Sequence, residues 1–251
     1  MRQQVAIQTL TETLRKDDAV EAIFLKGSFG RGEGDEHSDV DLYVLVADGD
    51  VASFLTRRRD HLAAYRPILL TDEIHIVAPQ LIVVYDDFLH VDLFTVTIET
   101  LNDQDEVTVL YDPEARLKSH RSKLTLSDDA LFNHAFDAVW FFFQYTKARD
   151  RGNDIWATEM LRQGMSHFVY ALAAHYDSSR STLGLKDVAA RGLIPLRDWY
   201  ERLTPSQHAS AAAEYVRRLE SEETFLTSIV GFERIETFYR QLLHREKSRL
   251  A

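Results

Sequence analysis

Residues 24–46 read FLKGSFGRGEGDEHSDVDLYVLV, and this stretch decides the fold of the first half of the chain. An apolar run ends at Gly27-Ser28, a loop rich in glycine and charge follows, and Ser38-Asp39-Val40-Asp41 opens a second apolar run. Short apolar runs bounded by turn residues are typical of buried strands. The stretch therefore predicts a strand, a tight turn, a loop and a second strand.

The spacing of the two aspartates in this stretch predicts a metal site. Side chains on a strand alternate between faces, so Asp39 and Asp41 point to one side and Val40 to the other. Paired carboxylates suit hard divalent cations such as Mg²⁺, which bind oxygen and often share substrate phosphates. An isolated Asp-x-Asp is more often a solvated strand end, so this interpretation depends on the neighbouring residues.

Gly27 and Ser28 predict an anion-binding turn beside the aspartates. Glycine lets the backbone approach a ligand closely, and backbone N–H groups together with the Ser28 hydroxyl can hold phosphate oxygens. The turn is not a P-loop, because no Gly-Lys-Ser/Thr follows, and the glycines do not lead straight into a helix as in a dinucleotide fingerprint. The combination predicts a site that transfers a nucleotidyl group with the help of a metal ion.

A third carboxylate, Asp92, lies in the apolar run HVDLFTV at residues 90–96. An acid inside so apolar a strand is costly unless it has a partner, so we expect Asp92 to join Asp39 and Asp41 in one cluster. His90 shares the face of Asp92. It is either a contact of the metal or substrate or a histidine satisfied within the sheet, and we favour the second interpretation.

The order of these motifs resembles the nucleotidyltransferase superfamily that includes DNA polymerase β. GSFGRGEGDEHSDVDL and the later HVDLF are most similar to antibiotic nucleotidyltransferases, with the lincosamide enzymes first and the aminoglycoside enzymes next. The resemblance implies an α+β fold, with an N-terminal polymerase β-like nucleotidyltransferase domain (a mixed sheet with helices) and a C-terminal helical bundle. It covers the first half of the chain, and its motifs identify the superfamily rather than the substrate.

The resemblance also implies a reaction and its catalytic residues. A nucleotidyl group, expected to be AMP from the co-substrate ATP, would pass in line to a hydroxyl of a small antibiotic, and pyrophosphate would leave. Asp39, Asp41 and Asp92 would ligate Mg²⁺, and Asp92 would ligate the second metal, take the proton of the acceptor hydroxyl, or do both. Some aminoglycoside enzymes use a glutamate as the base, but no glutamate of this chain matches that position.

Four further residues are implied as ligands of the triphosphate. Gly27, Ser28 and Arg31 would hold the β and γ phosphates. Lys147, near the end of the first bundle helix, would contact the triphosphate, although a solvated helix end stabilised by the helix dipole explains this lysine equally well.

The composition excludes several other classes of protein. The chain has 251 residues and no cysteine, which excludes disulfides and thiolate sites and fits a cytoplasmic location. The sequence holds no apolar run long enough to span a membrane, and its N-terminal residues lack the apolar segment of a signal peptide. Acidic residues outnumber basic ones by 40 to 29, for a net charge of −11, which disfavours nucleic acid as a partner.

The periodicity of the sequence divides the chain into a nucleotidyltransferase domain at 1–122 and a helical bundle at 123–251. In the first part we expect helices at 4–17 and 49–65 and strands at 22–26, 40–46, 73–77, 80–85, 90–96 and 107–111. In the second part we expect helices at 128–151, 154–176 and 185–191, one opened by Thr204-Pro205-Ser206-Gln207 and ending near 219, and one at 222–245.

Two other functions remain open on the sequence alone. Minimal nucleotidyltransferases of toxin–antitoxin pairs AMPylate a partner protein, but a chain that carries its own bundle fits a small acceptor better. A non-catalytic nucleotide-binding module would retain the fold, although three intact acids argue against it. The resemblance also implies a possible homodimer.

Overall fold

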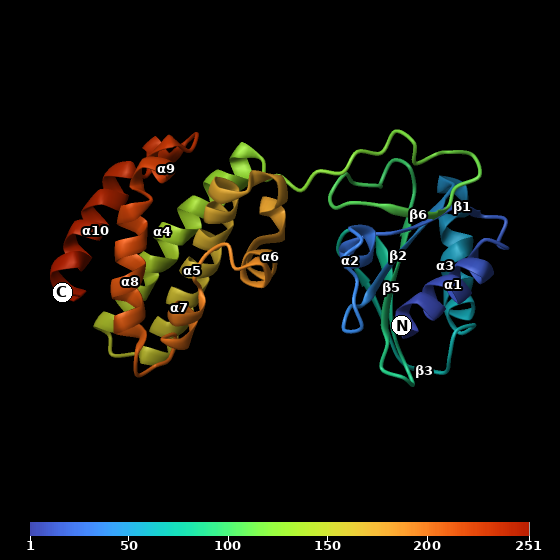
Figure 1. The fold of residues 1–251 in the computed structure, drawn as a ribbon, viewed down its shortest axis with the longest axis horizontal. Coiled ribbons are helices and arrows are strands. Elements are labelled where there is room, and N and C mark those ends of the chain that lie inside the picture. The colour runs from blue at the N-terminus through green and yellow to red at the C-terminus, as the bar shows by residue number, and fades with distance from the viewer. Residues whose placement is uncertain (251) are drawn as a thin grey trace. The chain divides into compact units, whose positions relative to one another are not determined.

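Figure 1 shows a computed structural model of the protein, which describes residues 1–250. The chain divides into two units, Met1–Lys123 and Leu124–Ala251. This division lies next to the boundary expected between 122 and 123, and the assignment of the two parts as separate domains stays a prediction. The first unit is a mixed sheet with helices and the second is helical, so the predicted α+β class is confirmed.

The first unit contains a six-stranded sheet in the order β3-β4-β5-β2-β1-β6. β2 pairs in parallel with β5, and all other neighbours pair antiparallel. The strands are β1 (Val20–Leu25), β2 (Val40–Val46), β3 (Ile68–His75), β4 (Pro79–Tyr85), β5 (His90–Val96) and β6 (Thr108–Tyr111). β2 and β5 have the predicted bounds. β3 spans Ile68–His75 rather than 73–77, and its start at the apolar run Ile68-Leu69-Leu70 was missed in a strand that is largely exposed at the edge of the sheet.

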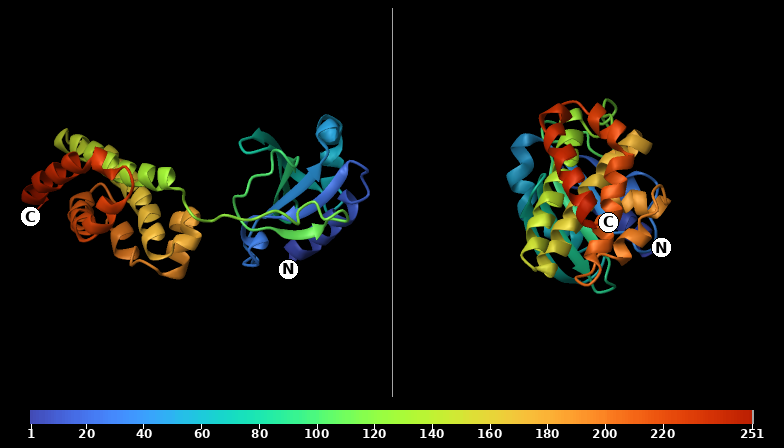
Figure 2. Two further views of the ribbon diagram at one scale, coloured as in Figure 1. Left: turned by 90° about the horizontal axis from the view of Figure 1, so that it is seen from above. Right: turned by 90° about the vertical axis from the view of Figure 1, so that its left-hand side faces the viewer.

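Helices α1 (Arg2–Leu14) and α3 (Val51–Leu62) cover one face of the sheet (Figures 1 and 2). The short helices α2 (Gly27–Gly30) and η1 (Asp48–Asp50) complete the unit. Val5 is 57% exposed. The buried stripe runs through Gln3, Ala6, Leu10 and Leu14, whose spacings of three and four residues place them on one face, whereas Val5 lies about 140° around the helix from Leu10.

Two arginines of the basic triplet Arg57-Arg58-Arg59 on α3 form ion pairs with neighbouring elements. Arg58 is buried, with its Nη2 atom 3.1 Å from Glu73 Oε2. Arg57 donates two hydrogen bonds to the carboxylate of Asp17, which follows α1. These ion pairs tie α3 to its neighbours.

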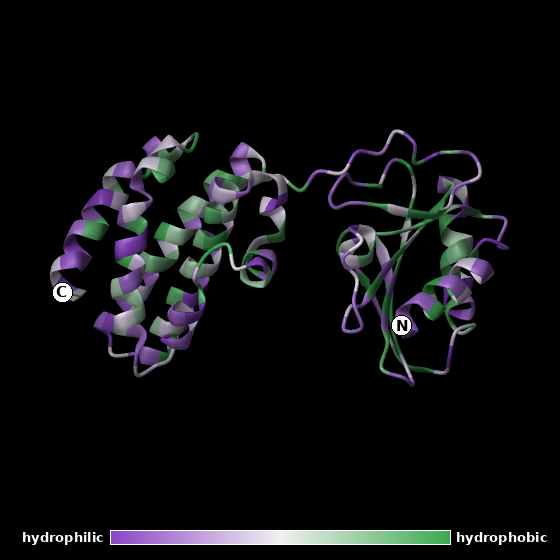
Figure 3. Ribbon diagram, viewed as in Figure 1, coloured by the Kyte–Doolittle hydropathy of each residue, from purple (hydrophilic) through white to green (hydrophobic). Residues whose placement is uncertain are grey.

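The opposite face of the sheet has its own apolar cluster. The rings of Phe24, Tyr43 and Phe94 stack across β1, β2 and β5, with centroid separations of 5.2 and 4.4 Å. Leu117 and the partly buried Leu101 pack on the same cluster from the segments after β5 and β6. Figure 3 shows the central strands coloured as hydrophobic. This is the face on which Asp41 and Asp92 lie.

The second unit is a helical bundle whose core includes residues of α4, α5, α8 and α10 (Figure 2). Its elements are α4 (Asp128–Asp150), α5 (Asp154–Tyr176), η2 (Ser178–Leu183), α6 (Gly184–Arg191), α7 (Arg197–Glu201), α8 (His208–Ser221), α9 (Glu223–Ser228), η3 (Phe232–Arg234) and α10 (Glu236–Leu250). Ser127 caps α4 by accepting a hydrogen bond from the Ala130 N–H, and Gly152 has a φ of 70° just after its end. These end signals explain why α4 and α5 lie where the sequence predicted.

The last part of the chain differs from the prediction in three places. The single helix expected over 222–245 is broken into α9, η3 and α10, because Gly231 adopts a φ of 90° that interrupts it. Thr204-Pro205-Ser206-Gln207 forms a turn ahead of α8 rather than its first turn, and Gln207 is the N-cap. α7 was not predicted.

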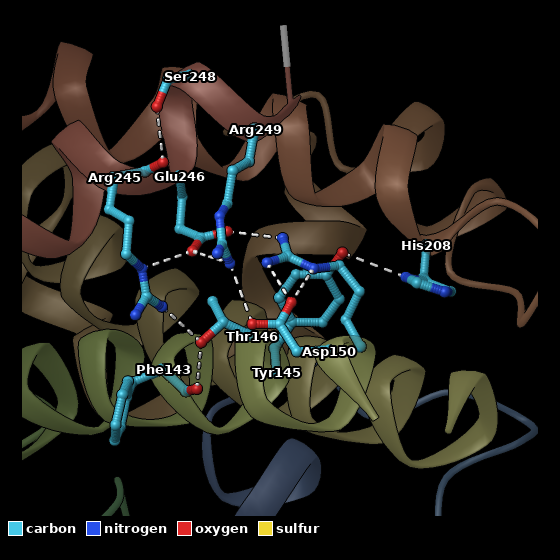
Figure 4. Close-up of polar contacts among 10 residues, drawn as sticks. Phe143, Tyr145, Thr146, Asp150, His208, Arg245, Glu246, Ser248 and Arg249 are labelled. Carbon is cyan, nitrogen blue, oxygen red and sulfur yellow. Dashed lines mark hydrogen bonds and ion pairs between the residues drawn. The ribbon is translucent and has the colours of Figure 1, made fainter. Parts of the chain in front are cut away.

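A buried ion network fixes α10 to α4 (Figure 4). Glu246 is fully buried, and its two carboxylate oxygens accept hydrogen bonds from Arg149 at 2.6 Å and Arg245 at 2.9 Å. Arg245 also donates to the Thr146 hydroxyl at 2.9 Å. Charges are buried in proteins when they are paired in this way, so the network defines how the last helix packs.

Within residues 1–250, no helix is both long enough and apolar enough to cross a membrane.

Replacing Glu246 with alanine tests the network. The change leaves the Arg149 guanidinium without its closest partner, and we expect the free energy of unfolding to fall by about 3 kcal/mol, as measured by urea denaturation. Glu220→Ala is the matched control, because Glu220 pairs with the exposed Lys247 at 2.9 Å and should cost less than about 1 kcal/mol. Equal losses for the two variants would show that the buried network does not hold α10.

Candidate active site

The parallel pairing of β2 and β5 places the acids of the site side by side. Asp41 and Asp92 are direct partners in the register of the two strands. Asp39 precedes β2 and shares the side of the strand to which Asp41 points. The acids therefore collect at one end of two central strands, on the face opposite α1 and α3.

Asp39, His90 and Asp92 form a group that can hold a metal ion. One potential ligand atom from each residue lies within 4.8 Å of the others. His90 Nε2 is 3.0 Å from Asp92 Oδ1, and His90 Nδ1 is 3.9 Å from Asp39 Oδ2. The hydrogen bond to Asp92 raises the pKa of the His90 imidazole above its ordinary value. Two carboxylates and one imidazole are a donor set that fits a divalent cation.

The surroundings of Asp41 make its ionisation unfavourable. Burial, followed by the negative charges of Asp39, Asp92 and Asp105, raises the pKa of Asp41 from 3.8 to about 6. Its Oδ2 atom lies 1.9 Å from the position that a Cβ atom would take at Gly27. Glycine at 27 is therefore required for this approach, and its φ of 62° also favours glycine. Asp41 links the acid cluster to the turn.

The turn after β1 already holds an anionic group. The Gly27 N–H donates to Asp105 Oδ2 at 3.1 Å, and Arg31 Nη1 donates to the same oxygen at 2.6 Å. Ser28 lies between these two donors in α2. The arrangement shows that the backbone and Arg31 together bind a carboxylate oxygen, which has the charge and hydrogen-bonding character of a phosphate oxygen.

Lys26 adds a buried cation next to the turn. Its Nζ atom donates to Asn102 Oδ1 at 2.9 Å and to the carbonyl oxygens of Asn102 at 3.0 Å and Gln104 at 2.8 Å. Burial lowers the pKa of Lys26. Lys26, Gly27, Asp41, Asn102 and Asp105 are among the residues that line a cavity of about 170 Å³ beside the acids.

The structure thus brings together most of the predicted site residues. Asp39 and Asp92 lie in one group with His90, and Asp41 is the strand partner of Asp92 but lies outside that group, against Gly27. Gly27, Ser28 and Arg31 form the adjoining turn. Their roles in metal and phosphate binding stay predictions.

Lys147 belongs to the second unit. It is exposed on α4, where its Nζ atom donates to Gln144 Oε1 at 3.3 Å and lies 5.3 Å from the centre of the Phe143 ring. These contacts fit the interpretation of Lys147 as a residue on the solvated end of a helix. Its contact with the triphosphate stays a prediction.

Sequence reasoning missed the segment that faces the turn. It did not single out Lys26, Asn102 or Asp105 as site residues. Asp105 lies 78 residues from Gly27 along the chain, and no local motif connects them. The only available signal was the run of polar residues at 102–106, NDQDE, between β5 and β6. His90 was recognised as sharing the face of Asp92, and the structure shows that it contacts both Asp92 and Asp39.

Comparison with known families identifies the first unit. Residues 8–85 match the sequence model of the family described as "Polymerase beta, Nucleotidyltransferase". The matched segment contains the turn, Asp39 and Asp41, and it ends before Asp92. The chain therefore carries a nucleotidyltransferase domain of the polymerase β type and is an enzyme. No curated protein sequence matches the chain.

Two solved structures are similar over most of the chain. An aminoglycoside 6-adenyltransferase from Bacillus subtilis is 11% identical, with 96% of this chain and 98% of that chain covered and a TM-score of 0.34. A STING-associated CdnE c-di-GMP synthase from Capnocytophaga granulosa is 14% identical, with 99% of this chain and 80% of that chain covered and a TM-score of 0.36. Similarity at this level carries no argument about substrate.

The raised pKa of Asp41 predicts how stability depends on pH in metal-free buffer. The unfolded chain loses the Asp41 proton near pH 3.8, whereas the folded protein loses it near pH 6. Ionisation of Asp41 therefore lowers the free energy of unfolding as the pH rises between these two values, and the full loss is present above them. Asp41→Asn should therefore raise the thermal unfolding temperature at pH 7.5, and the gain should vanish at pH 3.5. A variant that is destabilised equally at both pH values would contradict this electrostatic account.

Proposed function

We propose that this enzyme transfers AMP from ATP to a hydroxyl group of a small antibiotic, with a lincosamide as the favoured acceptor, and releases pyrophosphate. The observation that carries the proposal is the register of β2 and β5, which sets Asp41 directly beside Asp92 next to an anion-binding turn. The transfer of a nucleotidyl group needs both parts, a place for divalent metal and a place for the triphosphate. The lincosamide class rests on the similarity of GSFGRGEGDEHSDVDL and HVDLF to those enzymes, and an aminoglycoside is the second candidate.

The carboxylates supply the ligands for the metal. Asp39, Asp41 and Asp92 would hold Mg²⁺, and His90 lies within reach of the same position. The bound cation would neutralise charge on the triphosphate and on the departing pyrophosphate. This assignment also accounts for the crowding of like charges, because a cation among them would offset the repulsion that raises the pKa of Asp41.

The turn would hold and orient the triphosphate. The Gly27 N–H and the Arg31 guanidinium are the donors that would bind oxygens of the β and γ phosphates, and the Ser28 hydroxyl would add a third. Positioning provides much of the rate enhancement in phosphoryl-type transfers, because little covalent chemistry is required of the protein. The α phosphorus would then face the carboxylates at the strand ends.

Asp92 is the residue we assign to proton transfer. The acceptor hydroxyl gives its proton to the Asp92 carboxylate as its oxygen bonds to the α phosphorus, and the bond from that phosphorus to pyrophosphate breaks. Asp92 is 7% exposed and hydrogen-bonded to His90, so the imidazole fixes the orientation of the carboxylate. His90 is a positioning residue in this scheme.

The acceptor is identified by a direct assay. The purified protein is incubated with MgATP and lincomycin, clindamycin or a panel of aminoglycosides, while pyrophosphate release and product mass are followed. A drug that gains the mass of one AMP supports the proposal and names the acceptor. Pyrophosphate release with no drug adduct would favour AMPylation of a protein or an acceptor outside the panel, and the absence of nucleotide turnover with any metal would favour a binding module.

Loss of the strand carboxylates should abolish turnover without unfolding the protein. We expect Asp39→Asn and Asp92→Asn each to lower the rate of pyrophosphate release by about a thousandfold, because each removes a metal ligand and about 4 kcal/mol of transition-state stabilisation. Asp48→Asn is the control, since Asp48 is exposed beyond the other end of β2. Wild-type turnover by Asp92→Asn would rule out its role as ligand and base.

A further inference from the structure

The segment Asn102–Asp105 occupies the anion-binding groups of the turn. Asp105 Oδ2 accepts hydrogen bonds from the Gly27 N–H and from Arg31. Asn102 and Gln104 accept all three hydrogen bonds that the Lys26 ammonium group can donate. Gly27 and Arg31, two of the three proposed phosphate donors, are therefore engaged by the protein itself.

Asp105 holds this position in an unfavourable backbone conformation. Its φ is 71°, in the left-handed region that residues with a side chain rarely adopt, although aspartate tolerates it better than most. The Arg31 side chain is 11% exposed and that of Asp105 is 22% exposed, so the ion pair between them is partly shielded from water. The contact with the turn offsets the local strain of the segment.

We propose that Asp105 occupies the position of a nucleotide phosphate in the free protein and that residues 102–105 leave the turn when a nucleoside triphosphate binds. The inference rests on the proposed function, and it adds a step of conformational release at the same site. It also assigns Lys26 a second role, because the departure of the segment frees an ammonium group beside the incoming phosphates.

Simple electrostatics argues that Asp105 and a triphosphate exclude each other. The single Gly27 N–H points at one acceptor, and a phosphate oxygen in that position would lie against the Asp105 carboxylate. Two anions in direct contact repel each other strongly in a partly buried site. The cavity of about 170 Å³ is also smaller than the roughly 300–1,000 Å³ typical of ligand pockets. Movement of the segment that lines it would relieve both conflicts.

Calorimetric titration with Mg²⁺ and α,β-methylene-ATP tests the proposal. We expect Asp105→Asn to bind the nucleotide about tenfold more tightly than the wild type, because a larger fraction of the protein then has a free turn. Asparagine tolerates positive φ, so the substitution removes the charge without adding strain. Thermal unfolding of each variant checks that it is folded.

Asp103→Asn is the matched control. Asp103 lies in the same segment, and its charge also acts on Lys26, but it is exposed and its side chain makes no contact with Gly27 or Arg31 within residues 1–250. We expect its nucleotide affinity to stay within about threefold of the wild type. Equal tightening in both variants would show that general charge removal is responsible, and it would overturn the proposal.

The remaining outcomes separate this inference from the proposed function. Wild-type binding with unchanged or weaker affinity in Asp105→Asn overturns the displacement alone and would fit Asp105 as a metal ligand. Absence of nucleotide binding in every variant overturns the proposed function and this inference with it.

Hydrogen exchange of the wild type gives a second test that needs no substitution. The N–H groups of Gln104 and Glu106 donate to the side chains of Asn102 and Asp105, so their exchange reports the state of the segment. Binding of Mg²⁺ and α,β-methylene-ATP should speed exchange in the peptide that covers 102–106 while slowing it in the turn at 27–31. Slower exchange in both peptides would show that the segment stays in place, and it would overturn the displacement.

Discussion

The parallel pairing of β2 with β5 is the constraint on which the rest of the site depends. Its register sets Asp41 beside Asp92 at the centre of the sheet, where burial and like charge both oppose ionisation. α1 and α3 pack on the other face of the sheet and hold the strands in place. The acids therefore cannot move apart to relieve their repulsion. Strain of this kind is common at catalytic centres, because the substrate or metal that relieves it is thereby bound more tightly.

The free protein balances this charge with its own groups. His90 lies against Asp92 and Asp39, and Arg31 pairs with Asp105 at 2.6 Å. In the proposed function, a metal–nucleotide complex would use the positions of both His90 and Arg31. The same donors and acceptors are thus available in two arrangements, one internal and one with ligand, which gives a physical basis for coupling nucleotide binding to the segment between β5 and β6.

The sequence predicted those parts of the molecule that are encoded locally. β2, β5, α4 and α5 were placed correctly or within a residue, because apolar periodicity and end signals agree there. The clustering of the strand acids followed from alternation along each strand. Asp105 could not be predicted, since its contact with Gly27 spans 78 residues and depends on the path of an irregular segment. The break at Gly231 was missed because the apolar pattern continues across it.

The most direct measurement of the central claim is anomalous diffraction at the manganese edge, from crystals grown with Mn²⁺ and a non-hydrolysable ATP analogue. The account predicts a manganese peak among the carboxylates of Asp39, Asp41 and Asp92, with the nucleotide phosphates against Gly27 and Arg31. A bound nucleotide with no manganese at the ends of β2 and β5, or with its phosphates away from the turn, would contradict it.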